Sequence, residues 1–354
     1  MSNVTFLIGN GFDLACGLKT RFIDMYPAYT QTVSANSAIK QFKTDITNDG
    51  SLHFEKWSDF EMGLAGYAQN WHSEEEMLTC IEDFTTFMIQ HISKEQRDFS
   101  AMLTARVKDF TSQEILDSTR TFYRGLPHND PVHRIDDLLS DETVNLFFLS
   151  FNYTSILDGL LTAAFSGVDK AHMRVRYHNP IHIHGILSGP VLGVDNEQQI
   201  HNLQFALSTS GKRALIKPQY NREYDTIQLE RTLDTIQKSD VICVYGKRFG
   251  PSDQMWNQAI GEWLIDNSAH ELIYYDHNSS LFQSNISWRR MDKEESTKQR
   301  LTEELFNSNE IGEQVFSQIH VPIGSDIFRI ARAVEAGRAA EEKTRPRIVS
   351  STHQ

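Results

Sequence analysis

Short runs of consecutive hydrophobic residues recur along the chain, and each one ends in a polar or glycine-rich turn. The first run, Val4 to Ile8, ends at Gly9-Asn10-Gly11 and leads into helix-compatible residues. Val144 to Phe151 is apolar almost throughout, as expected of a strand covered on both faces in a parallel sheet. Asp240 to Tyr245 and Glu271 to Tyr275 have the same character. These runs predict buried β-strands.

Most segments between these runs have the apolar spacing of amphipathic helices. The spacing predicts a mainly helical region from about 36 to 140 and helices over 155–164, 222–238, 254–265, 292–306 and 325–340. It also predicts a short alternating strand over 181–184, a weak strand over 315–322, and a loop or flap over the polar stretch 195–220.

Strands that alternate with helices predict an α/β fold, here a Rossmann-like, mostly parallel sheet flanked by helices. We divide the chain into a Rossmann-like domain formed by 1–35 and 141–342, a helical insertion subdomain at 36–140, and a disordered tail at 343–354.

Composition narrows the class of protein. The net charge of −13 disfavours a protein that coats nucleic acid through its overall field. Three widely spaced cysteines give neither a disulfide framework nor a metal-binding pair, which indicates a reducing compartment. No apolar run approaches the roughly 18 residues of a membrane span, so we expect a cytoplasmic protein that does not enter the membrane.

Unusual residues follow the strands at the edge where an open parallel sheet binds its ligands. They lie in four loops: Gly9-Asn10-Gly11-Phe12-Asp13, Phe151-Asn152-Tyr153-Thr154, His182-Ile183-His184-Gly185 and Tyr245-Gly246-Lys247-Arg248-Phe249-Gly250. A Gly-x-Gly turn before a helix lets backbone N–H groups approach a phosphate, although the same glycines also make a tight turn.

Asn152 follows a buried strand, so its amide needs a partner, which either a loop bond or a ligand ribose supplies. On a strand, His182 and His184 project to one face. One of them is a candidate general base, and a metal pair or a structural pair is the alternative.

Two further groups have a functional and a structural interpretation. Asp59 and Glu61, next to Trp57 and Phe60, belong either to a site or to a helix face and core. Lys247 and Arg248 either meet an anionic ligand or face water.

These residues, in this order, resemble the AbiH family, named for bacteriophage abortive infection. The resemblance rests on Ile8-Gly9-Asn10-Gly11-Phe12-Asp13-Leu14-Ala15-x-Gly17-Leu18, on Trp57-x-Asp59-Phe60-Glu61, and on the Asn152 and His184 loops, and it extends from residue 4 to about 280.

The same loops are similar, more distantly, to sirtuin-like NAD-consuming domains. That resemblance implies that Asn152 orients water and the nicotinamide ribose, that His184 is the base, and that Asp276 to Asn278 lie near the adenosine. Asp13 stands where the sirtuin-like motif has a phosphate-binding Ser, Lys19 where it has Pro, and Thr154 where it has Asp.

The resemblance implies an antiphage effector that hydrolyses NAD to nicotinamide and ADP-ribose, with no separate cofactor or bound metal. The candidate catalytic residues are Asn152, His184 and Asp13. The candidate nucleotide-binding residues are Gly9, Asn10, Gly11, Phe12, Tyr153, His182, Gly246, Arg248, Phe249 and Asp276.

Two other functions remain open: a metal-dependent nuclease that uses Asp13, Asp59, Glu61 and His184, and a sensor that binds NAD or ADP-ribose without turnover. We also expect a homo-oligomer that responds to a phage-derived trigger or a partner defence protein.

Overall fold

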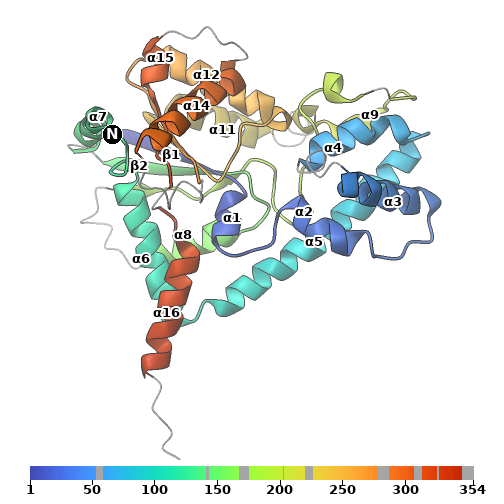
Figure 1. The fold of residues 1–354 in the computed structure, drawn as a ribbon, viewed down its shortest axis with the longest axis horizontal. Coiled ribbons are helices and arrows are strands. Elements are labelled where there is room, and N and C mark those ends of the chain that lie inside the picture. The colour runs from blue at the N-terminus through green and yellow to red at the C-terminus, as the bar shows by residue number, and fades with distance from the viewer. Residues whose placement is uncertain are drawn as a thin grey trace, which may run out of the picture.

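The computed structural model describes residues 1–52, 59–140, 143–166, 175–201, 203–219, 226–277, 287–306, 313–324 and 327–344. In these ranges seven parallel strands form one sheet in the order β3-β2-β1-β5-β6-β7, and β4 pairs with the end of β2 that β3 does not reach. Figure 1 labels two of these strands, β1 and β2. The strands are β1 (Ser2–Ile8), β2 (Val144–Ser150), β3 (Val175–Tyr177), β4 (Ile181–His182), β5 (Val241–Tyr245), β6 (Glu271–Tyr275) and β7 (Ile319–His320). The predicted α/β fold with a Rossmann-like sheet is confirmed.

The three central strands are in a register that aligns their carboxyl ends. Ile8 of β1 lies opposite Ser150 of β2 on one side and Tyr245 of β5 on the other. The loops that follow these strands therefore meet at one edge, where a doubly wound sheet binds ligands.

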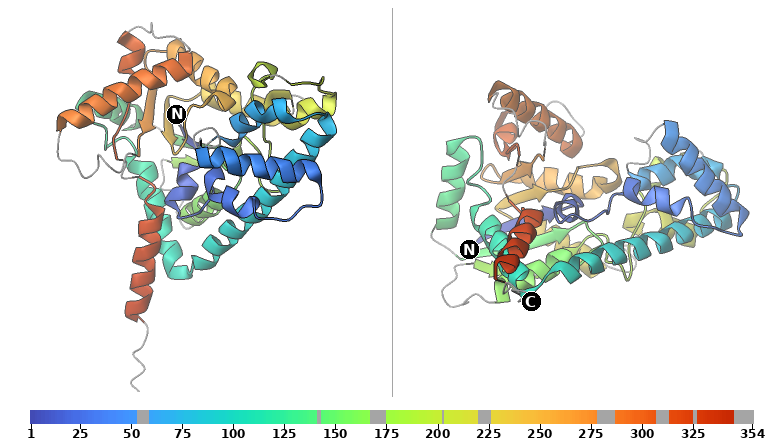
Figure 2. Two further views of the ribbon diagram at one scale, coloured as in Figure 1. Left: turned by 45° about the vertical axis from the view of Figure 1, so that its right-hand side comes forward. Right: turned by 60° about the horizontal axis from the view of Figure 1, so that its bottom comes forward.

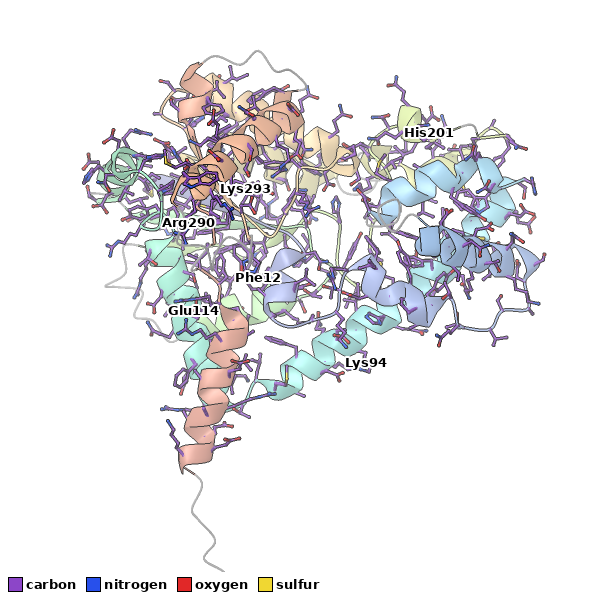
Figure 3. All side chains as sticks on the ribbon, in the orientation of Figure 1. Phe12, Lys94, Glu114, His201, Arg290 and Lys293 are labelled. Carbon is purple, nitrogen blue, oxygen red and sulfur yellow. The ribbon has the colours of Figure 1, made fainter. Side chains whose placement is uncertain are left out.

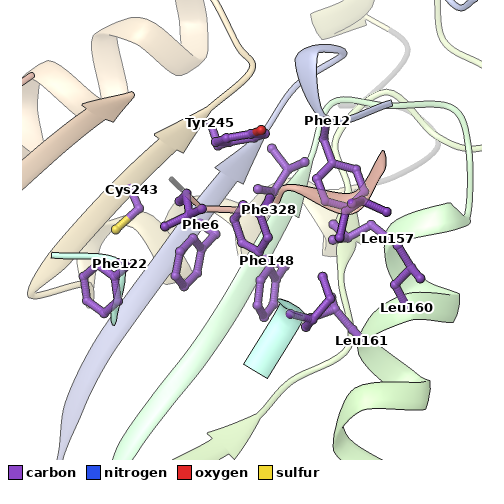
Figure 4. Close-up of a cluster of buried hydrophobic side chains, with 14 of the residues drawn as sticks. Phe6, Phe12, Phe122, Phe148, Leu157, Leu160, Leu161, Cys243, Tyr245 and Phe328 are labelled. Carbon is purple, nitrogen blue, oxygen red and sulfur yellow. The ribbon is translucent and has the colours of Figure 1, made fainter. Parts of the chain in front are cut away.

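Alternate residues of each strand enter two hydrophobic cores on opposite faces of the sheet. Phe6 and Ile8 face α6 (Ala105–Thr121), α8 (Ile156–Ser166) and α16 (Ile330–Thr344), whereas Leu7 faces α11 (Thr226–Gln237), α12 (Gln254–Asp266) and α14 (Ser287–Phe306). Figure 4 shows the first core, in which the ring of Phe6 stacks on that of Phe148 at 5.1 Å. Helices on both faces explain why the strands are apolar almost throughout.

A third core belongs to a helical subdomain on one side of the sheet (Figure 2). Its helices are α2 (Phe22–Tyr29), α3 (Ser37–Leu52), α4 (Phe60–Tyr67), the 3-10 turn η2 (Ala68–Asn70) and most of α5 (Glu74–Met102). Helix α5 is 29 residues long, and its buried side chains from Met77 to Ile92 pack in this core, whereas Phe99 packs in the sheet core. It thus links the two parts of the molecule.

The packing divides the chain differently from the expected insertion at 36–140. Helix α2, expected in the first Rossmann-like segment, packs in the helical subdomain. Helices α6 and α7 (Asn129–Ser140), expected in the insertion, contribute Val107, Ile115 and Ile135 to the sheet core. Every segment involved is amphipathic, so periodicity could not decide which core each one covers.

The remaining described elements are short. The stretch expected to be a loop contains the 3-10 turn η3 (Glu197–Gln199) and α9 (Thr209–Leu215), and a 3-10 turn η4 (Pro251–Asp253) precedes α12. The weak strand expected over 315–322 is α15 (Glu313–Ser317) followed by the two-residue β7. Within the described residues, no helix is both long and apolar enough to cross a bilayer. Trp57, Asn278 and the expected tail beyond Thr344 lie outside the described residues.

Candidate functional site

The glycine turn after β1 makes a close contact with the loop after β5. Gly9 N–H donates to Tyr245 O over 2.9 Å, and Gly11 N–H donates to Gly246 O over 2.8 Å. A Cβ atom on Gly11 would lie 2.4 Å from the Cα of Gly246, which itself has a φ of +68°. Glycine is needed here because two backbones touch. The face of the turn toward β5 is therefore occupied by protein, and the Gly11 N–H has a backbone acceptor.

Two neighbours of these glycines have structural partners. The Asn10 side chain exchanges hydrogen bonds with Thr20, accepting from its hydroxyl and donating to its carbonyl. Phe12 is fully buried and packs edge-on against Phe328 and Tyr245, as Figure 4 shows. In this conformation both residues anchor the start of α1 (Gly11–Ala15) and do not face an open site.

Asp13, on α1, is a buried carboxyl with one hydroxyl donor. It is 2% exposed, and Thr154 Oγ1 donates to it from 2.9 Å. Burial raises the pKa of Asp13 to about 7, although Thr154, Asn152 and the charge of His182 all act in the opposite direction. Asp13 and Thr154, two of the three positions that differ from the sirtuin-like motifs, are thus bonded to each other.

The side-chain amide of Asn152 lies close enough to Asp13 to lower the pKa of that carboxyl, but the contact between them does not have the geometry of a hydrogen bond. Asn152 is 4% exposed. Among the described residues neither its Nδ2 nor its Oδ1 has a hydrogen-bond partner. A buried polar group that lacks its partner costs about 1–3 kcal/mol, so an amide with both ends unpaired is a strong sign of a missing ligand or water.

His182 contacts the same loop through its backbone. Its Nδ1 lies 3.0 Å from Asn152 O, and its Nε2 lies 3.0 Å from Asp158 Oδ2 at the start of α8. Burial alone would lower the pKa of His182, but the hydrogen bond and charge of Asp158 outweigh it and raise the pKa above its ordinary value. Asp13, Asn152, Thr154, His182 and Asp158 together form what we call the Asn152 cluster.

Alternate residues of the loop after β2 face a second group of polar side chains. The ring of Phe151 lies edge-on to His184 at 5.4 Å and beneath the ammonium of Lys247 at 3.8 Å. Tyr153 donates to Val191 O over 3.2 Å, and nearby carboxylates add to the effect of burial in raising its pKa.

This second group, which we call the Lys217 network, is a buried set of ion pairs. Lys217 Nζ lies 2.8 Å from Glu61 Oε2 and 3.0 Å from Asp253 Oδ1, and Lys247 Nζ lies 2.6 Å from Asp253 Oδ2. His184 Nε2 lies 2.9 Å from Asp253 Oδ1. The network joins helix α4, the segment after α9, and the loop between β5 and α12.

Burial and the ion pairs change the pKa values of the titratable groups in this network. Burial and the charge of Lys217 lower the pKa of His184 to about 4, so its imidazole is neutral at pH 7. Burial raises the pKa of Glu61 to about 7, opposed by Lys217. Burial would also raise the pKa of Asp253, but Lys217 and Lys247 hold it well below its usual range.

The two expected histidines therefore belong to different clusters. Strand β4 ends at His182, and His184 lies in the turn that follows, so the expected strand alternation does not extend to it. Because Nε2 of His184 faces a carboxylate, that nitrogen carries the proton and Nδ1 is the acceptor. Within the described part of the chain, this buried Nδ1 has no hydrogen-bond partner.

The described residues of the motif Trp57-x-Asp59-Phe60-Glu61 have different roles: one caps a helix, one packs in the core and one lies in the Lys217 network. Asp59 caps α4 by accepting from the backbone N–H groups of Glu61 and Met62, and its Oδ2 accepts from Ser252 Oγ over 3.0 Å. Phe60 stacks on Phe84 in the helical core, whereas Glu61 reaches the Lys217 network.

Three of the residues expected to bind the nucleotide, Arg248, Phe249 and Asp276, lie outside both clusters. Arg248 is exposed and Phe249 is buried in a sheet core. Asp276 accepts from Thr297 Oγ1 and lies 3.3 Å from Lys293 of α14, which is labelled in Figure 3. A cleft of about 520 Å³ lies over the start of α12, beside the Lys217 network, and includes Asp195, Lys212 and Gln258 in its lining.

Sequence reasoning missed Asp158, Lys217 and Asp253. None of them lies in a motif, and Lys217 reaches Glu61 across 156 residues of chain. A weak signal for Asp158 was its position as an acid in the first turn of a predicted helix. In the described residues, no group of three or more His, Cys, Asp or Glu side chains is placed to hold a metal ion.

Comparison with known proteins gives a family. The model of the family described as bacteriophage abortive infection AbiH matches residues 5–275. That range covers more than half of the 354 residues and includes both clusters. No curated protein matches the chain significantly. The chain therefore belongs to the AbiH family of bacteriophage abortive infection proteins.

Proposed function

We propose that this protein is an abortive-infection effector that hydrolyses NAD at the nicotinamide N-glycosidic bond, with the Asn152 cluster as its active site. A role in phage abortive infection follows from membership of the AbiH family. The observation that carries the enzymatic part is the buried, unpaired amide of Asn152 beside the Asp13 carboxyl, at the carboxyl ends of the central strands.

An amide with both ends unpaired fits a ligand that offers a donor and an acceptor close together. A ribose hydroxyl does both, because it can donate to Oδ1 and accept from Nδ2. Asn152 would thereby orient the ribose whose C1′–N bond breaks. The likeness of these loops to sirtuin-like domains supports the same assignment.

Nicotinamide leaves NAD as a neutral molecule, so the step needs no strong acid. As the C1′–N bond breaks, its electron pair goes to nicotinamide and the ribose becomes cationic. An ionised Asp13 stabilises that charge. Water then adds to C1′ and gives up one proton, which leaves ADP-ribose.

Asp13 is also the proton acceptor that the geometry favours. Its pKa of about 7 suits general base catalysis near neutral pH. His184, the base that the resemblance implies, is bonded to Asp253 and has a pKa of about 4. Its unpaired Nδ1 makes it the second candidate acceptor.

Asp13 and Asn152 are nearly inaccessible, at 2% and 4% exposure. The proposal therefore includes an opening step before NAD binds. A phage-derived trigger or a partner defence protein would supply it by binding the open form more tightly than the closed one.

The test is release of nicotinamide and ADP-ribose from NAD, followed by chromatography. Purified protein is assayed alone and with extracts of phage-infected and uninfected cells. We expect Asn152→Ala and Asp13→Asn each to lower the rate about 100-fold or more. Asn145→Ala is the matched control, because Asn145 lies at the other end of β2, where its side chain donates a hydrogen bond to Asn3 Oδ1.

Absence of NAD loss in every condition, from protein that confers phage resistance in cells, would reject the hydrolase. Binding of NAD without turnover would instead identify a sensor. Cleavage of RNA or DNA that needs Mg²⁺ or Mn²⁺ and is stopped by a chelator would identify a nuclease. The geometry does not favour a nuclease, because the ammonium of Lys217 already lies against Glu61 and Asp253.

A further inference from the structure

We propose that Asp158 and His182 act as a positioning pair for this site, with His182 held as an imidazolium that fixes the Asn152 loop and favours the ionised form of Asp13. The effect of the pair on catalysis rests on the proposed function. The protonation of His182 and its dependence on Asp158 can be tested without any measurement of activity.

The contacts of His182 tie three elements together. It ends β4, its Nε2 contacts Asp158 of α8, and its Nδ1 contacts the carbonyl of Asn152 after β2. Its own carbonyl accepts a hydrogen bond from the Gln228 side chain on α11. The ring is therefore held from both sides, and its position fixes the peptide that carries the unpaired amide.

The identity of the two partners determines the charge of the ring. A carboxylate and a carbonyl are both acceptors, and an imidazole donates to two acceptors only when both nitrogens carry protons. Among the described residues, the charged or titratable groups that face His182 are Asp158 and Asp13, and both favour this cation. His182 is 12% exposed in its side chain and Asp158 is 34% exposed, so solvent weakens the pair without cancelling it.

The charge of His182 reaches the carboxyl that the reaction uses. Burial raises the pKa of Asp13, and the imidazolium is one of the groups that oppose this rise. The thiol of Cys16 also faces Asp13, but burial keeps it protonated at neutral pH. Without the imidazolium, Asp13 would bind its proton up to a higher pH. His182 thus acts on the reaction through Asn152 and Asp13 and does not need to touch the substrate.

The first measurement is independent of activity. In protein labelled with ¹⁵N-histidine, the imidazole signals of His182 are assigned by comparison with His182→Gln and titrated from pH 5 to 9. We expect both ring nitrogens of the wild type to be protonated at pH 6.5. In Asp158→Asn the titration midpoint should fall by about one unit, because a charged partner is lost. Asp98→Asn, which removes an exposed carboxylate paired with Lys94 on α5, should leave it unchanged.

The second measurement is the pH profile of kcat/KM for NAD hydrolysis. If Asp13 must be ionised, the rate rises with pH through its pKa. Asp158→Asn should move the midpoint of that rise upward by about half to one unit, and Asp158→Glu should restore it. A pair that serves folding alone would lower the rate equally at every pH.

These outcomes separate the two proposals. A wild-type His182 that is neutral at pH 6.5, or an Asp158→Asn variant with unchanged titration, overturns the positioning pair even if NAD is cleaved. An unchanged pH midpoint in an active Asp158→Asn variant also overturns it. Absence of NAD cleavage together with a protonated His182 rejects the hydrolase and leaves the pair as a structural fact.

Discussion

Replacing Asp13 by Asn should stabilise the protein at neutral and alkaline pH while it removes the proposed activity. The carboxyl is 2% exposed, and burial raises its pKa from 3.8 to about 7. Between pH 3.8 and about pH 7, Asp13 is therefore mostly protonated in the folded state and mostly ionised in the unfolded state. The folded state therefore loses stability as pH rises through that window.

The size of the effect follows from the shift. About three pKa units at 1.36 kcal/mol each correspond to about 4 kcal/mol lost above pH 8, relative to pH 3. By pH 5 the loss is only about 1.7 kcal/mol on the same relation. Asn cannot ionise and can still accept from Thr154. The advantage of Asp13→Asn over the wild type should thus grow by about 2–3 kcal/mol between pH 5 and pH 8.

Urea unfolding at pH 5 and pH 8, followed by circular dichroism, measures this difference. Other titrating carboxyls, such as Glu61, affect both proteins alike and cancel in the comparison. An advantage that does not change with pH, or a variant less stable than the wild type at pH 8, would refute the assigned environment of Asp13. A gain in stability with a loss of NAD hydrolysis is what a strained catalytic carboxyl predicts.

Three further predictions concern the residues around the site. Gly11→Ala should destabilise the fold by several kcal/mol, because the new Cβ would lie 2.4 Å from the Cα of Gly246. Gly66→Ala on α4 is its control: nothing lies within 4 Å of the new Cβ, so this variant should stabilise the fold by about 0.5–1 kcal/mol. Thermal denaturation of both variants measures the difference. Lys217→Met should cost about 3–5 kcal/mol in urea unfolding, because it leaves the buried Glu61 without its cation and Asp253 with Lys247 alone, and a cost below 1 kcal/mol would contradict a tight network. The pKa of His184 is lowered to about 4, so this group by itself makes the folded state lose about 3 kcal/mol as pH falls from 6.5 to below 4. His184→Gln lacks that contribution, so the difference in urea-unfolding stability between the wild type and the variant should change by about 3 kcal/mol across this range, and a constant difference would contradict the assigned environment of His184.

The sheet could be predicted from sequence because its strands are buried on both faces. The predicted run Glu271 to Tyr275 coincides with β6, and the run from Val144 exceeds β2 by one residue. The core that each helix covers could not be predicted in the same way. An amphipathic helix shows that it covers a core but not which core, and α6 and α7 cover the sheet.

The candidate site could be predicted only in its local parts. Sequence reasoning placed Asp13 and Asn152 at one edge of the sheet, and the structure brings them together. It expected His182 and His184 on one face, but the turn that ends at Gly185, with a φ of +71°, separates them. Lys217 and its partners come from segments far apart in sequence, so no local pattern could reveal the network.

A crystal structure with ADP-ribose bound tests the central claim most directly. The account predicts that the Asn152 side-chain amide hydrogen-bonds to a hydroxyl of the ribose distal to adenosine, with the Asp13 carboxyl facing C1′. It also predicts that His182 keeps its contacts to Asp158 and to the Asn152 carbonyl. An ADP-ribose bound elsewhere, with the Asn152 amide paired only to protein or water, would contradict the account.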